Sequence, residues 1–339
     1  MQSDVHDATA RPDVDTKPRR LEARVHTSVE DLESLRPWWT AHQTHPNTDL
    51  DYFLLVCRQT PQLLSPLVIS LREGGDLVAL LVGRLERLTV KPRIAYLRLP
   101  GVTVNRITIL HGGLIGALDE AAAAQALGFA RSLLQTQRAD SVLFNLVSHE
   151  STLWRVAQRG TGHAAGFATA RPIEHWVMKL EAEPGFLVRH MKSKHRSWYK
   201  RKQREVVTEF AEITWTWHAA DIDVPALCQE MESVAAQTYQ RGLGAGFRDD
   251  AVHRARLEKY ARGGHLRCIT LRLNGQPSGF WYGTVYGDAF HSMATGYLPA
   301  LAKLEIGTQM FMALVDHLVQ EKVTCFDFGL GDAHYKQRF

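Results

Sequence analysis

The chain has 339 residues, of which 45% are apolar and 22% are charged, and its formal net charge is +4. This composition indicates a folded, soluble protein with a sizeable core, and the small positive excess does not by itself indicate nucleic-acid binding. No apolar run reaches the roughly 20 residues that a membrane-spanning helix requires.

The cysteines and the N-terminus indicate the compartment. Cys57, Cys228, Cys268 and Cys325 are far apart in sequence, so zinc-site spacing is absent and buried thiols in a reducing compartment are expected. The first 20 residues contain acids and prolines where a signal peptide needs an apolar core. We therefore expect a cytoplasmic protein whose residues 1–20 form a disordered tail.

Two stretches of the chain repeat each other without a gap. "LREGGDLVALLVGR" at 71–84 aligns with "LRLNGQPSGFWYGT" at 271–284. Each copy has a Gly-Gly or Asn-Gly pair between two apolar runs, and such pairs favour the positive φ angles of hairpin turns. Each stretch is therefore predicted to be a β-hairpin.

A second repeat follows the first in the same order. "FARSLLQTQRADSVLFNL" at 129–146 resembles "FMALVDHLVQEKVTCFDF" at 311–328, and each is typical of an amphipathic helix followed by a buried strand. Asp119 is expected to cap the helix of the first copy. The repeats indicate a duplicated α/β (α+β) module, with a tail at 1–20 and modules at 21–175 and 176–339. Arg171-Pro172 and Glu183-Pro184 interrupt regular structure near that boundary.

A basic segment opens the second module. Residues 189–204 contain eight Lys or Arg and no acid, while Met191, His195 and Trp198 share one helical face. The segment can be a solvated helix, or it can bind an anionic acceptor such as a nucleotide-sugar, polysaccharide, lipid headgroup or transfer RNA. The substrate-binding residues predicted on these grounds are Lys194, Arg196, Trp198 and Tyr199.

A strand, a loop and a helix follow the second hairpin. "HSMATGY" at 291–297 is typical of a strand, and Gly307 is expected to open a helix that ends near Val319. A glycine at a helix N-terminus lets backbone N–H groups approach a phosphate, which the helix dipole also favours. Glu305 would repel that phosphate, so an ordinary amphipathic helix is the alternative.

The closing stretch "CFDFGLGDAHYKQRF" at 325–339 combines a buried strand with glycines and polar groups. Asp327-Phe328-Gly329 is the tripeptide that binds magnesium in protein kinases, but no Gly-rich loop or H-R-D motif accompanies it. Asp327 is predicted mainly to bond a turn. Asp332 can cap a short helix that holds Tyr335 and Lys336.

Other catalytic signatures are absent. The chain contains no G-x-S-x-G elbow, P-loop, H-E-x-x-H motif or Rossmann fingerprint. His42 and His45 lack further ligands at fixed spacing and are expected in a polar loop, so no metal site is predicted.

The basic segment, the 296–318 region and the closing stretch resemble the GNAT acyltransferases. They are most similar to the double-module, Fem-related group that includes BioF2-like and CelD-type proteins. The resemblance covers roughly residues 50–339 and implies tandem GNAT-like modules, each with a mixed, mostly antiparallel twisted sheet flanked by helices. The usual phosphate loop, Q/R-x-x-G-x-G/A, is reduced here to "KLEIGT" with one glycine.

The resemblance also implies roles for individual residues. The strand and loop that contact the acyl-coenzyme A donor correspond to Ala294, Thr295, Gly296, Tyr297, Lys303, Gly307 and Thr308. Tyr335 corresponds to the tyrosine that protonates the departing thiolate, and Lys336 would stabilise an oxyanion or bind a phosphate. The general base stays open among His291, Glu305, Asp327 and Asp332. Trp281 and Asp332 are also expected to contact the substrate.

These implications lead to three hypotheses. The first is an N-acyltransferase that moves an acyl, in particular an acetyl, group from coenzyme A to a small-molecule or saccharide amine in polysaccharide or cell-envelope metabolism, with the donor held by the second module. The second is a Fem-like transferase that uses aminoacyl transfer RNA. The third is a non-catalytic scaffold of a polysaccharide-synthesis complex. An exposed edge beyond the last strand would also favour a homodimer.

Overall fold

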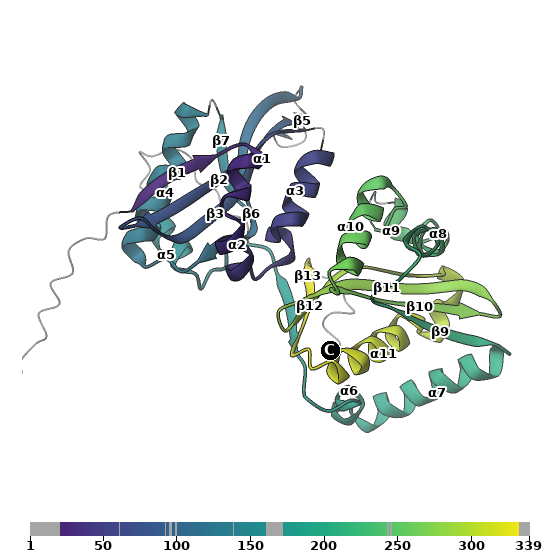
Figure 1. The fold of residues 1–339 in the computed structure, drawn as a ribbon. Coiled ribbons are helices and arrows are strands. Elements are labelled where there is room, and N and C mark those ends of the chain that lie inside the picture. The colour runs from purple at the N-terminus through teal and green to yellow at the C-terminus, as the bar shows by residue number, and fades with distance from the viewer. Residues whose placement is uncertain are drawn as a thin grey trace, which may run out of the picture. The chain divides into compact units, whose positions relative to one another are not determined.

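The computed structural model describes residues 21–60, 62–91, 93–94, 97–98, 100–137, 139–160, 172–242, 244 and 246–331. The chain folds into two compact units (Figure 1). The first comprises Met1–Trp38 and Gln62–Phe167, and the second comprises Trp39–Pro61 and Ala168–Phe339. No described helix is long and apolar enough to cross a membrane.

The first unit contains one large sheet and its helices. Its described strands pair in the order β1-β2-β3-β6-β7. The elements are β1 (Glu22–His26), α1 (Val29–Glu33), β2 (Leu63–Glu73), β3 (Asp76–Val90), β4 (Arg93–Ile94), β5 (Leu97–Arg98), β6 (Val102–Gly116), α4 (Glu120–Thr136), β7 (Ser141–Phe144) and α5 (Thr152–Gly160), with α2 (Arg36–His42) crossing into the second unit. As expected, Asp119 caps α4 by accepting the Ala122 N–H at 2.8 Å.

The second unit has a sheet with the order β8-β13-β12-β11-β10-β9. Its elements are η1 (Pro46–Thr48), α3 (Leu50–Gln59), β8 (His175–Lys179), α6 (Phe186–His190), α7 (Ser193–Glu209), β9 (Ile213–His218), α8 (Val224–Ala235), α9 (Tyr239–Gly242), α10 (Ala251–Arg262), β10 (Leu266–Leu273), β11 (Gln276–Tyr286), β12 (Ala289–Tyr297), η2 (Pro299–Leu304), α11 (Ile306–Gln320) and β13 (Cys325–Leu330).

Alternating side chains of the central strands build a separate core on each face of this sheet. On β11, Trp281 packs with α6, α7 and α11, whereas Phe280 and Tyr282 pack with α3, α8 and α10. Figure 1 shows the same two helical layers. Trp281 is only 2% exposed, so it is a core residue in this structure and not the substrate contact that we expected.

The strand pairing accounts for the edge of the second sheet. β13 lies between β12, which is parallel to it, and β8, which is antiparallel. The outer side of β13 is therefore paired within the chain. We expected a homodimer because an edge beyond the last strand would be exposed. β13 is paired on both sides, so that reason does not hold.

Both repeats have the structure that the sequence predicts. The two hairpins, β2–β3 and β10–β11, share a register shift at the same position, at Leu71/Arg72 and at Leu271/Arg272. In both, the arginine donates to the carbonyl of the turn glycine, at 2.7 Å in the first and 3.4 Å in the second. The repeated helix and strand are α4–β7 and α11–β13.

One segment from the first part of the sequence joins the second unit. We placed residues 21–175 in one module, but Trp39–Pro61 packs with Ala168–Phe339. Asp49 connects this segment to the rest of the unit, because its carboxylate accepts from the Tyr286 hydroxyl at 3.1 Å and pairs with Lys259 at 2.6 Å. The same carboxylate caps α3 by accepting the Tyr52 N–H at 2.9 Å. Its side chain is 8% exposed. Sequence periodicity carries no signal for such a long-range pair.

Asp49→Ala should therefore loosen α3 more than the loss of a helix cap does. Removing one partner of a buried ion pair costs about 3 kcal/mol or more, whereas losing a cap costs about 1 kcal/mol. We expect hydrogen exchange of the α3 amides to show that Asp49→Ala lowers the free energy of local opening by the larger of these two amounts. The control is Asp223→Ala, because the exposed Asp223 only caps α8. Equal effects on the two capped helices would contradict this assignment.

Candidate active site

The two parallel strands of the second sheet pair briefly and then separate. β12 and β13 pair at Ala289↔Cys325, Phe290↔Phe326 and His291↔Asp327. Beyond that point β12 continues to Tyr297 along β11, while β13 continues to Leu330 along β8. The edge of β12 that faces β13 therefore has no strand partner after His291 among the described residues. Its backbone N–H and C=O groups can bind an extended ligand.

A buried carboxylate lies at the point of separation. Asp327 Oδ1 bonds His175 Nε2 and the Gly329 N–H, each at 2.7 Å, and Asp327 Oδ2 bonds His291 Nδ1 at 3.2 Å. Burial alone would raise the pKa of Asp327, but the bonds from His291, Gly329 and His175 outweigh it and hold that pKa well below its usual range. The carboxylate is therefore ionised at neutral pH.

The ionised carboxylate determines the proton on His291. A carboxylate can only accept, so Nδ1 of His291 carries the hydrogen. In the neutral imidazole the lone pair is then on Nε2. That atom is buried and has no hydrogen-bond partner among the described residues. The arrangement presents a base to whatever occupies the space beside it.

A third histidine lies against this pair. The His45 ring is edge-on to the His291 ring, with 5.0 Å between centroids, and its Nδ1 accepts the Asn47 N–H. We call His45, His175, His291 and Asp327 the Asp327 cluster. Among the described residues no group of three His, Cys, Asp or Glu has the geometry of a metal site.

The sequence prediction found half of this cluster. His291 and Asp327 were candidates for the base, although Asp327 was assigned mainly to a turn, and its bond to the Gly329 N–H confirms that part. His175 and His45 were missed because they are 152 and 246 residues from Asp327 and His291 respectively. Only the pairing of β8 with β13 brings His175 into reach.

The residues expected to bind the donor lie along β12 and the start of α11. Ala294–Tyr297 lie on β12 beyond the end of its pairing with β13 and stay paired with β11, and Lys303 is exposed in η2. Glu305 has φ 56° and accepts from the Thr308 hydroxyl at 3.2 Å. Gly307 touches the Tyr297 ring, and a Cβ there would come within 2.9 Å of Tyr297 Cε1.

The N-terminus of α11 fits an anion better than the corresponding end of α4. Asp119 caps α4 and Glu120 adds a second negative charge in its first turn. α11 has no side-chain cap and no acid in its first turn, although Glu305 immediately precedes it. The first N–H groups of α11 have no side-chain cap in the described part of the chain and can donate to a phosphate, as the helix dipole favours.

The residues of the basic helix α7 are of two kinds: some bond or pack within the unit, and others line a groove. Arg196 donates to the carbonyls of Val188, Arg189 and Met191, and Tyr199 is 6% exposed in the core. We expected both residues to bind the substrate, but Arg196 bonds backbone carbonyls and Tyr199 is in the core. Lys194 and Trp198 line a groove beside η2. Asp332, Tyr335 and Lys336 lie outside the described residues.

The comparisons with known proteins agree with this geometry. Residues 193–337 match the family described as "Acetyltransferase (GNAT) domain". The second unit carries a GNAT domain. No functionally curated protein matches the chain.

Solved structures share the fold of this chain over most of its length. FemX has a TM-score of 0.57 at 10% identity over 92% of this chain and 89% of its own. L-PGS from Bacillus licheniformis has a TM-score of 0.52 at 14% identity over 89% and 78%. A tandem GNAT protein from the clavulanic acid biosynthesis pathway has a TM-score of 0.48 at 13% identity over 94% and 93%. At such low identity the likeness concerns the fold alone.

The first unit repeats the hairpin, helix and strand of the second without the Asp327 cluster. Its parallel strands pair up to Ile109↔Phe144, and the next residues are Leu110 and Asn145. In the repeat Asn145 aligns with Asp327, and Ile109↔Phe144 is the last parallel pair of this unit as His291↔Asp327 is of the second. Isoleucine and phenylalanine cannot accept a proton and the Asn145 amide carries no charge, so within the described parts of the two units the ionisable pair at the end of the parallel strands occurs only in the second.

The low pKa of Asp327 predicts a pH-dependent contribution to stability. A carboxyl whose folded pKa is lowered stabilises the fold above its unfolded value of about 3.9, and the contribution is lost as the pH falls toward the folded value. Asp327→Asn should lower the free energy of unfolding by about 2 kcal/mol at pH 7, with a smaller difference below pH ~4. Chemical denaturation at several pH values measures this.

The control for this experiment is Asp288→Asn. Asp288 is an exposed aspartate in the turn between β11 and β12, and its one described side-chain bond is accepted from the Thr324 hydroxyl. Its replacement should change stability by no more than about 0.5 kcal/mol. A loss in Asp327→Asn that stays constant from pH 7 to pH 3 would rule out the ionised, hydrogen-bonded carboxylate.

Proposed function

We propose that this protein is an N-acyltransferase that moves an acyl group from a coenzyme A thioester to an amine. One observation carries the proposal: the buried Nε2 of His291, which has no hydrogen-bond partner in the described part of the chain, lies where β12 and β13 separate, and Asp327 fixes its tautomer. Attack by an amine requires removal of a proton, and a positioned neutral imidazole is suited to that task.

The reaction is a direct transfer. The amine nitrogen forms a bond to the acyl carbon, the carbon–sulfur bond breaks, and the amine proton passes to His291 Nε2. Asp327 stabilises the imidazolium that results, because its carboxylate accepts the Nδ1 hydrogen. The departing thiolate needs a proton of its own, and Tyr335 stays our prediction for that donor.

The donor is assigned to the second unit on three grounds. Its β12 edge is unpaired beyond His291, its α11 N-terminus has no side-chain cap, and it alone has the Asp327 cluster among the described residues of the two repeats. An acyl chain between the separating strands would place the thioester near His291. The same features weigh against a non-catalytic scaffold, since a scaffold needs no partnerless buried imidazole.

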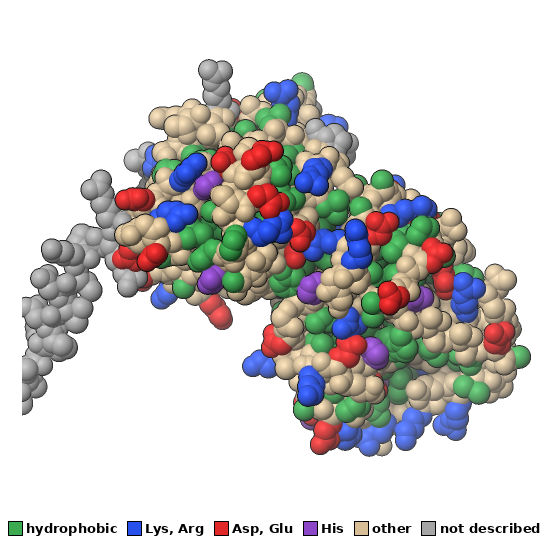
Figure 2. Space-filling view, in the orientation of Figure 1, with side chains coloured by type: hydrophobic (Ala, Val, Ile, Leu, Met, Phe, Trp, Pro, Cys, Tyr) green, Lys and Arg blue, Asp and Glu red, His purple; other side chains and the backbone are tan. Residues whose placement is uncertain are grey.

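The exposed basic residues of α7 keep transfer from aminoacyl transfer RNA as a second candidate. Figure 2 shows Lys and Arg side chains in a row along the rim of the second unit where α7 runs in Figure 1. Such a row attracts polyanions in a salt-dependent way. The acceptor, whether an amino sugar, an amino acid or another amine, follows from neither feature.

The proposal is tested by binding and by turnover with acetyl-coenzyme A. At a hundred times its dissociation constant the ligand should stabilise the second unit by about 2.7 kcal/mol. Release of free thiol should then identify an acceptor among amino sugars, amino acids and polyamines. In that reaction His291→Gln should lower kcat by about 10²-fold or more, because general base catalysis contributes that much.

The matched control is His190→Gln, which replaces an exposed histidine of the same unit that is paired with Glu181. It should leave kcat unchanged. If neither acetyl-coenzyme A nor longer acyl thioesters stabilise the protein, the proposal fails. Salt-sensitive binding of charged transfer RNA in the same experiment would then favour the second candidate.

A further inference from the structure

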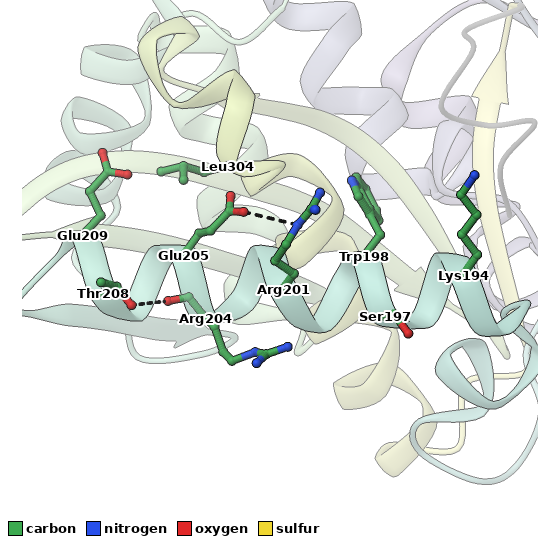
Figure 3. Close-up of a pocket in the computed structure, with 9 residues that line it drawn as sticks. All are labelled: Lys194, Ser197, Trp198, Arg201, Arg204, Glu205, Thr208, Glu209 and Leu304. Atoms are coloured by element: carbon green, nitrogen blue, oxygen red, sulfur yellow. Dashed lines mark hydrogen bonds and ion pairs between the residues drawn. The ribbon is translucent and has the colours of Figure 1, made fainter.

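A groove runs between α7 and the turn that leads into α11 (Figure 3). Its volume is about 930 Å³, which is within the range of small-molecule sites. The groove is lined by Lys194, Ser197, Trp198, Arg201, Arg204, Glu205, Thr208, Glu209 and Leu304. Hydrogen bonds fix its two walls together, because Gln309 Nε2 of α11 donates to Lys202 O at 3.4 Å and to Leu304 O at 2.9 Å.

The side chains on the groove side of α7 change in charge along the helix, with an aromatic ring and two cations toward its start and the carboxylates of Glu205 and Glu209 toward its end. In Figure 3, Lys194, Trp198 and Arg201 extend to the side of α7 on which Leu304 lies, whereas Ser197 and Arg204 extend away from it. Lys194, Trp198 and Arg201 follow one another at i, i+4 and i+7, so they form one stripe of the helix. A stripe of this kind suits a ligand that joins an aromatic ring to phosphate groups.

Glu205 sets the charge balance of the groove. Its carboxylate pairs with Arg201 at 3.4 Å and with Lys202 at 2.6 Å, so it holds the Arg201 guanidinium in place and partly offsets it. Lys194 lies at the other end of the stripe, in the first turn of α7, and is exposed. Lys194 is therefore the cation with the least competition from the described acids.

The position of the groove favours the donor over the acceptor. The unpaired edge of β12 ends at Tyr297 and leads through η2 directly to Leu304, so one continuous stretch of chain borders both the strand edge and the groove. The phosphate loop between them has a single glycine and carries Glu305. Positive charge supplied from α7 would offset that acid.

We propose that this groove binds the phosphorylated adenosine end of the coenzyme A donor, with Trp198 against the adenine and Lys194 and Arg201 against phosphate groups. The inference rests on the proposed function and adds a binding surface that lies outside the repeated hairpin, helix and strand. It assigns α7, whose residues have no counterpart in the repeat, to recognition of the donor.

Calorimetric titration with coenzyme A, dephospho-coenzyme A and pantetheine tests the groove without knowledge of the acceptor. Lys194→Met should weaken binding of coenzyme A about 10-fold, which is the effect of losing one charge-assisted contact. It should leave pantetheine binding unchanged. Trp198→Leu should weaken coenzyme A and dephospho-coenzyme A alike, by about 5-fold or more, because both contain the adenine.

The matched control is Lys200→Met, since Lys200 is exposed on the same helix and does not line the groove. It removes the same charge and should leave all three affinities unchanged. Equal effects of Lys194→Met and Lys200→Met would mean that α7 acts only through its overall positive charge, and this would overturn the proposal. Equal affinity of the unmodified protein for coenzyme A and pantetheine would also overturn it.

The outcomes separate this inference from the proposed function. If transfer from acetyl-pantetheine is as efficient as from acetyl-coenzyme A and still depends on His291, the groove proposal fails and the acyltransferase proposal stands. If neither coenzyme A nor pantetheine binds, both fail. If charged transfer RNA binds in a way that Lys194→Met weakens while coenzyme A does not bind, the groove serves the other donor.

Discussion

The chemistry of this molecule depends on one ionised carboxylate shared by two imidazoles. Asp327 is buried, and a buried charge is stable only where hydrogen bonds replace water. The required donors come from β8, β12 and the backbone of β13 itself. The pairing of these three strands therefore stabilises the charge, and the charge in turn orients His291.

The separation of β12 and β13 places the oriented His291 beside a strand edge that can bind a ligand. Parallel pairing ends at His291↔Asp327. The two residues that are joined by a side-chain hydrogen bond are therefore also the last pair of the two strands. Beyond them, the backbone of β12 is available on one side. A base and a binding edge thus arise from one structural event. In the first unit the parallel pairing ends at Ile109↔Phe144, two apolar residues, which shows that the scaffold alone does not specify the chemistry.

Local patterns in the sequence predicted much of the scaffold. The hairpins, the Asp119 cap, the α11 helix and the closing strand follow from turn residues and periodicity, which act over a few residues. The long-range features could not be predicted in this way. His175 and His45 reach the cluster only through tertiary packing, and Trp39–Pro61 joins the second unit through Asp49.

The basic segment shows the same limit at the level of single residues. Composition predicted an anion-binding helix, but it did not distinguish Lys194, which lines the groove, from Arg196, which bonds the backbone of α6. Nor did it distinguish Trp198, at the groove, from Tyr199, in the core. Neighbouring residues on a helix point about 100° apart, so their fate depends on which face packs against the sheet.

Hydrogen–deuterium exchange with and without acetyl-coenzyme A tests the central claim most directly. The account predicts slower exchange for the amides of residues 292–297 that point away from β11 and for the first turn of α11, with no change at residues 110–116 of the first unit or at the start of α4. Unchanged exchange in β12 at saturating acetyl-coenzyme A, or protection in β6 instead, would contradict the assignment of the donor site to the second unit.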